Sequence, residues 1–198
     1  MRLTTPVLAL ALLIFALPAS SQDYRIGDRL KPSATTARTT YQEITWDDLI
    51  PKDWDAMAAL KGINVARLRD GDPKAQEALD KLRAAWDAAP VVSTLENKRI
   101  RLAGFIVPLE RKGDLVSELL LVPSFGACIH SPPPPANQTV HVILNKPVAG
   151  LQTMDTFWIN GTLKTARGES GFGVFGYRLQ GESMERYRTL VSELGLRK

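Results

Sequence analysis

The chain holds one cysteine and two histidines, and two of these three residues stand two positions apart, Cys128 and His130. On an extended segment, side chains two positions apart point to the same side. A thiolate and an imidazole on one side can bind the same zinc or copper ion. We therefore predict a metal site at Cys128 and His130, with zinc as the expected cofactor.

This pair is half of a site, because zinc sites have three or four protein ligands. His141 is one candidate for the third ligand. In the stretch TVHVIL it lies on the face opposite Val140 and Val142, which suit a core, so we expect His141 to be exposed. Three carboxylates nearby in the sequence, or a partner protein, are the other candidates: Glu110, Asp114 and Glu118.

Two other interpretations of the cysteine stay open. Between Ala127 and Ile129 it could be a small packed hydrophobic residue. It could instead be a nucleophile or redox thiol, with His141 as the better placed base. No oxyanion hole and no third orienting group can be read from the sequence. We therefore favour a role without catalysis.

Four prolines follow the cysteine and histidine at once: Pro132, Pro133, Pro134 and Pro135. Such a run forms a stiff extended helix and could be no more than a rigid connection between two strands. It could also be a binding surface, since a pre-ordered apolar ridge loses little entropy when a partner docks. Pro123 and Phe125 would extend this ridge.

The first residues, MRLTTPVLALALLIFALPASSQ, predict export. A basic start, an apolar run and small residues before Gln22 are typical of a secretory signal peptide. We expect residues 1–21 to be removed by cleavage after Ser21, which places the mature chain in the periplasm. No later segment is long and apolar enough to span a membrane, so we expect no transmembrane helix in the mature chain.

The net charge of +4 is spread along the chain without a basic block, so we expect no nucleic-acid partner. Residues 22–42 lack any helical or strand period and predict a flexible linker. Residues 43–92 predict a helical region. Asp53 would begin a short helix that carries Met57 and Leu60 inward. Asp72 and Pro73 are the N-cap and first residue of a longer helix over 72–90.

Residues 93–198 predict a β domain that ends in a helix. Alternating and β-branched stretches predict five strands, over 98–110, 117–126, 139–145, 155–165 and 173–181. The fourth is either a hairpin at Asn160-Gly161 or one strand bent at that glycine. Ser183 would then cap a C-terminal helix. The expected fold class is α+β, with N-terminal helices, a five-stranded OB-like partly open β-barrel or bent sheet, and a C-terminal helix.

The central stretch resembles a family of exported bacterial proteins known as a domain of unknown function. The motif residues that carry the resemblance are Phe125, Gly126, Cys128, His130, Pro132, Pro133, Pro134, Pro135, Asn137 and Gln138. The likeness extends over about residues 43–181, from WDDLIP to GYRL. It implies an OB-like periplasmic module that accompanies transporter components, some of them linked to zinc. His141 lies outside this motif.

These observations predict a periplasmic accessory module. It would bind zinc through Cys128 and His130 and dock a membrane transporter component or another periplasmic protein by the proline ridge. Two alternatives stay open: a thiol-dependent enzyme or redox protein that uses Cys128, and a structural interaction domain in which the prolines are the interface.

Overall fold

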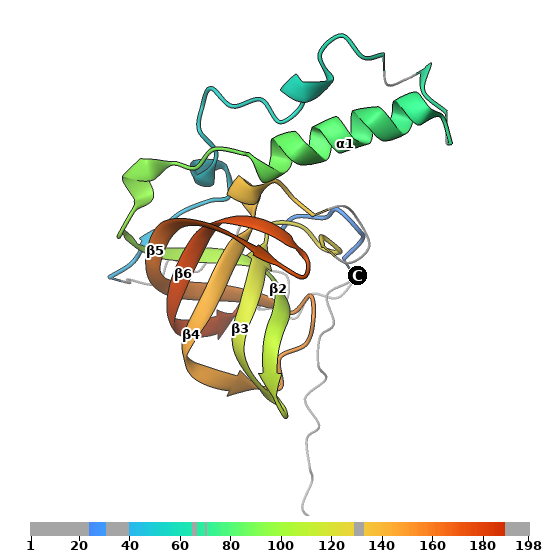
Figure 1. Ribbon diagram of the computed structural model, residues 1–198. Coiled ribbons are helices and arrows are strands. Elements are labelled where there is room, and N and C mark those ends of the chain that lie inside the picture. The colour runs from blue at the N-terminus through green and yellow to red at the C-terminus, as the bar shows by residue number, and fades with distance from the viewer. Residues whose placement is uncertain (1–23, 31–39, 65–66, 70, 129–132, 189–198) are drawn as a thin grey trace, which may run out of the picture.

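Five long strands form a closed barrel (Figure 1). The computed structural model describes residues 24–30, 40–64, 67–69, 71–128 and 133–188. The strands are β2 (Arg99–Lys112), β3 (Leu115–Val122), β4 (Val140–Ala149), β5 (Thr156–Ser170) and β6 (Gly173–Arg186). Their order is β2-β3-β4-β6-β5, and β5 pairs with β2 to close the barrel. A short strand, β1 (Gln42–Glu43), pairs in parallel with β2.

Alternation along the strands separates an inner from an outer face. On β2, Ile100, Leu102 and Ile106 belong to the main core, whereas Phe105 and Val107 belong to a second, smaller cluster. Side chains two apart on a strand share a face, so each set lines one side of the barrel wall. The main core also takes in buried residues of the other four strands: Leu119, Leu121, Val140, Val142, Ile159, Leu163, Tyr177 and Leu179.

The barrel was predicted as partly open, and that was wrong. β2 pairs with β5 from Arg99–Thr162 to Phe105–Thr156, so neither strand leaves a free edge there. β5 and β6 are also longer than the alternation in the sequence indicates, and their extra residues lengthen the ladder between these two strands. β5 continues through Gly161 as one bent strand, which confirms one of the two alternatives. A Cβ at Gly161 would lie 2.0 Å from the Gln180 backbone oxygen, so only glycine allows this approach.

The predicted N-terminal helices are also wrong, with one exception. Helix α1 (Pro73–Asp87) is present, and the Asp72 side chain caps it by accepting from the Lys74 N–H at 2.8 Å. Over 43–64 the chain forms only single 3-10 turns, η1 (Asp47–Leu49) and η2 (Ala58–Leu60). The Asp55 carboxylate accepts from the Met57 N–H at 2.9 Å, and such a local bond competes with the helical pattern.

The C-terminal helix predicted from Ser183 is a strand at its start. Ser183 pairs with Asn160 and Glu185 pairs with Trp158, so β6 supplies backbone partners for the first half of β5. These residues form a strand although their apolar spacing is helical, because a helix here would leave the first half of β5 without these backbone hydrogen bonds. The rest of this predicted helix, after residue 188, lies outside the described residues. Within the described ranges, no helix combines the length and the hydropathy needed to cross a membrane.

Helix α1 lies beyond one end of the barrel (Figure 1). Side chains fasten its C-terminal end. Arg167 of β5 donates to the Asp87 and Ala89 carbonyls, and the Trp86 indole N–H donates to the Ala56 carbonyl at 2.9 Å. The remaining turns, η4 (Ser93–Leu95) and η5 (Ala136–Gln138), lie before β2 and before β4. The end of α1 is therefore held close to the β3–β4 connection, which carries the cysteine and proline motif.

Candidate functional site

The first described residues of the motif, up to Cys128, lie on the outer face of the barrel after the end of β3. Phe125, Ala127 and Cys128 pack against the smaller apolar cluster formed by Phe105, Val107, Leu120, Val122 and Phe175. Residues 24–30 cover the same face: Tyr24 stands edge-on to Phe105 with ring centroids 4.9 Å apart. Gly27 and Asp28 exchange backbone hydrogen bonds with Phe125, both 2.8 Å long. The first part of the motif thus helps to form a second core.

Cys128 is a half-buried free thiol with a left-handed backbone, φ 67°. Burial raises its pKa to about 11, from an ordinary 9.0. A thiol with this pKa is protonated at neutral pH, and a protonated thiol is neither a strong nucleophile nor a metal ligand. His130 and Pro132, both named in the prediction, lie outside the described residues, so the structure leaves the Cys128–His130 pair a prediction.

His141 is buried, at 7% exposure, so the prediction of an exposed imidazole was wrong. Its Nε2 lies 2.8 Å from Glu118 Oε2, and its ring packs on Phe175 with centroids 4.8 Å apart. The outer face of β4 is therefore covered, although it lies outside the main core. His141 and Glu118, two of the four residues considered as a third metal ligand, therefore contact each other.

The other two candidates have local partners. Glu110 accepts from the Ser117 hydroxyl at 3.3 Å, and Asp114 accepts from the Gly150 N–H at 3.0 Å. Across the part of the chain that the structure describes, no three His, Cys, Asp or Glu side chains are placed to hold one metal ion. A complete site within this chain would need at least one ligand from outside the described residues, and His130 is the predicted one.

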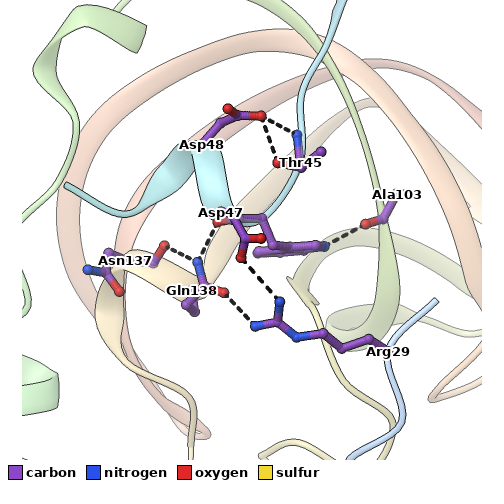
Figure 2. A network of polar contacts seen from close by, with 8 residues as sticks. Arg29, Thr45, Asp47, Asp48, Ala103, Asn137 and Gln138 are labelled. Atoms are coloured by element: carbon purple, nitrogen blue, oxygen red, sulfur yellow. Dashed lines mark hydrogen bonds and ion pairs between the residues drawn. The ribbon is translucent and has the colours of Figure 1, made fainter. Parts of the chain in front are cut away.

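Gln138, at the end of the motif, is the centre of a buried polar network (Figure 2). Its Nε2 donates to the Trp46 carbonyl at 2.7 Å and to the Asn137 carbonyl at 3.1 Å. The Asn137 side chain donates to the Pro90 carbonyl at 3.0 Å. The two amides connect the β3–β4 connection to two other segments. Gln138 reaches the segment between β1 and η1, and Asn137 reaches the segment just after α1. They therefore fix the position of the prolines that precede them.

The same glutamine positions a cation. Gln138 Oε1 accepts from Arg29 Nη2 at 3.4 Å, and Arg29 Nη1 lies 3.3 Å from Asp47 Oδ1 (Figure 2). Both Nε2 protons of Gln138 are used by carbonyls, so its Oε1 must face the guanidinium. The Arg29 side chain remains 53% exposed. The network thus presents a positive charge at the surface.

Arg29 lines an open pocket of about 320 Å³. Trp86 of α1 and Pro134 and Pro135 of the motif also line it. The remaining lining residues are Gly27, Pro123, Ser124, Ala127 and Gln138. Three parts of the chain that lie far apart in the sequence therefore meet around one small, mainly apolar space.

The glycine-rich stretch 168–176 supports the prolines. A Cβ at Gly173 would lie 2.7 Å from Pro133 Cβ, and a Cβ at Gly176 would lie 2.8 Å from the Ala136 oxygen. The end of the β5–β6 hairpin therefore packs directly against the motif. Phe172, at its tip, is 38% exposed.

Sequence reasoning pointed to the proline wall of the pocket but missed Arg29 and Trp86. Arg29 lies in a stretch without periodicity, which was predicted as a linker. Trp86 lies within the predicted helix over 72–90 and is half-buried. The sequence holds no signal that joins these two residues, because they meet only once the barrel has closed and α1 has docked.

Comparison with known proteins agrees with this architecture. A family model described as "Protein of unknown function (DUF3299)" matches residues 46–186. The chain belongs to the DUF3299 family. A crystal structure of a DUF3299 family protein from Pseudomonas aeruginosa PAO1 is similar, with 35% sequence identity and a TM-score of 0.58. The match covers 76% of this chain and 98% of that one. No curated protein matches the chain.

Proposed function

We propose that this DUF3299 protein is a non-catalytic accessory module that binds a partner protein in the pocket between Trp86, Arg29 and the motif prolines. The pocket carries the proposal. Its walls are rigid before any ligand arrives, because proline has a fixed φ and the Gln138 network holds the segment from behind. Binding to such a wall costs little ordering entropy.

The volume favours a short segment of a partner as the ligand. At about 320 Å³ the pocket is at the small end of the range for ligand sites, about 300–1,000 Å³. An indole and two prolines form an apolar slot, and aromatic-lined slots of this kind bind extended peptide segments. Export to the periplasm and a partner in a membrane transporter are part of the same proposal. Export rests on the first 22 residues, and the transporter partner rests on the family resemblance.

The state of the thiol favours this function over a thiol enzyme. A nucleophilic cysteine needs a lowered pKa, and burial raises the pKa of Cys128 instead. Zinc binding at Cys128 and His130 is a separate proposal. Zinc would have to release the thiol proton, so its apparent affinity would rise with pH. Metal analysis of the purified chain and of Cys128→Ser would test it, and equal zinc in both would exclude the site.

A peptide selection tests the binding function. Phage-displayed random peptides, selected on the full chain, would be titrated by fluorescence anisotropy against wild type, Trp86→Ala and Ser124→Leu. The leucine fills the pocket without removing a wall. Trp54→Ala is the matched control, since Trp54 is also half-buried but does not line the pocket.

We expect selected peptides to bind wild type and Trp54→Ala alike, and to bind both pocket variants at least about tenfold more weakly, as for truncation of an aromatic anchor. Thermal unfolding would show that the barrel is intact in each variant. If no peptide is enriched, or if the peptides bind the two pocket variants as well as they bind wild type, the proposal is wrong.

A further inference from the structure

We propose that Arg29 captures the C-terminal carboxylate of the partner chain, with the last apolar side chain of the partner against Trp86 and the prolines. This inference rests on the proposed function, because it names which part of a partner fills the pocket. It starts from charge. Among the described residues that line the pocket, Arg29 is the only charged one. An apolar slot with one cation at its rim complements an apolar group that carries one negative charge.

The Gln138 amide holds the Arg29 guanidinium in a fixed position. The Gln138 amide cannot turn over, because both of its N–H groups donate to carbonyls, so its oxygen stays directed at Arg29 Nη2. The side chain therefore loses less freedom when it binds an anion than a free surface arginine would. A planar guanidinium also matches the geometry of a carboxylate better than an ammonium does.

The present partner of Arg29 can be replaced. Asp47 meets the guanidinium through one contact of 3.3 Å, and its side chain is 80% exposed. Ion pairs of this kind contribute little, since water solvates the released carboxylate well. An incoming carboxylate can take the place of Asp47 on Nη1 while Gln138 keeps its contact with Nη2.

A chain terminus fits better than an acidic side chain within a segment. A terminus brings its carboxylate on the same residue as its last side chain, so both can enter a slot of about 320 Å³. Capture of a terminal carboxylate by fixed donors beside an apolar slot is a known mode of peptide recognition. The ligand class is therefore a protein C-terminus with an apolar last residue.

The test compares peptides that differ only in the terminal group. Fluorescein-labelled pentapeptides ending in leucine, valine or phenylalanine would be made as free acids and as amides. Each would be titrated against wild type, Arg29→Gln and Arg25→Gln. Arg25 is the matched control, since it is exposed and lies two residues before Gly27 but does not line the pocket. Both variants change the net charge equally.

We expect the acids to bind wild type and Arg25→Gln about tenfold more tightly than the amides, the scale of one charge-assisted contact at a part-exposed site. In Arg29→Gln the acids should fall to the level of the amides. Salt should reduce the difference between acid and amide on wild type, because the pair is exposed.

Equal binding of acids and amides to wild type would overturn the role of Arg29, while peptides that still depend on Trp86 would leave the binding function intact. A preference for acids that survives in Arg29→Gln would also overturn it. If none of these peptides binds wild type, the proposal that the ligand is a protein C-terminus is wrong. The phage selection would then be the remaining test of the binding function.

Discussion

Cys128 should react slowly with iodoacetamide at neutral pH in the folded chain. The reason is burial beside an apolar cluster, which raises the thiol pKa to about 11 from an ordinary 9.0. Each pKa unit changes the ionisation tenfold, so the thiolate fraction falls about 100-fold. A more basic thiolate is also more nucleophilic, which offsets about tenfold of this. We expect labelling at least about tenfold slower than for the unfolded chain, as the net of these two effects.

The assay follows labelling by intact mass at a series of pH values. The chain has one cysteine, so the mass reports this thiol alone. The same chain unfolded in urea is the control, because it carries the same thiol without the packing. The rate in the folded chain should still be rising above pH 10, whereas the unfolded profile should level off near its ordinary pKa.

A folded-state profile that levels off below pH 8, or labelling faster than in urea, would refute this reasoning. Either result would show a stabilised thiolate and would favour the thiol enzyme.

The pH dependence of the free energy of unfolding gives a second readout. Between about pH 9 and 11 the folded chain keeps a proton that the unfolded chain has lost, so stability falls as pH rises. The loss is at most about 3 kcal/mol, and Cys128→Ala should remove it.

Three further substitutions test the structure that supports the site, and for each the free energy of unfolding is measured in urea. Gly161→Ala should prevent folding or cost more than about 3 kcal/mol, since the new methyl meets backbone, whereas Gly171→Ala has open space and should change little. Gln138→Ala should cost about 1–3 kcal/mol by leaving buried carbonyls unpaired, and the exposed Gln180→Ala less than half as much. Asp72→Ala should cost about 1 kcal/mol through the lost helix cap. A control that costs as much as its partner, or an uncapped helix at full stability, would contradict these assignments.

The strands could be predicted because each alternates between two different environments. On β2, one face meets the main core and the other meets the second cluster, and both leave a pattern of period two in the sequence. Gly161 could be read as a bend for a related reason, since a glycine inside a strand marks a close backbone approach. Local patterns were sufficient wherever the environment itself repeats along the strand.

The end of the barrel could not be predicted in the same way. Residues from Ser183 onward have helical spacing, but they pair with the first half of β5. That strand lies about 25 residues earlier in the chain, so no local pattern indicates the pairing. The burial of His141 has a similar origin, since Phe175 of a different strand covers it. Arg29 and Trp86 show the same limit for the site, because neither has a local neighbour that indicates the pocket.

The central claim is that ligands bind in the pocket beside Trp86. The most direct measurement uses the four tryptophan indole N–H signals in nitrogen-15 NMR spectra of the full chain, recorded while the tightest selected peptide is added. Trp158, which lies under the Arg101 guanidinium on β2, and Trp54, which does not line the pocket, are internal controls. We predict that the Trp86 signal shifts most and that Trp54 and Trp158 stay in place. A largest shift at Trp54 or Trp158, with Trp86 unchanged, would contradict the account.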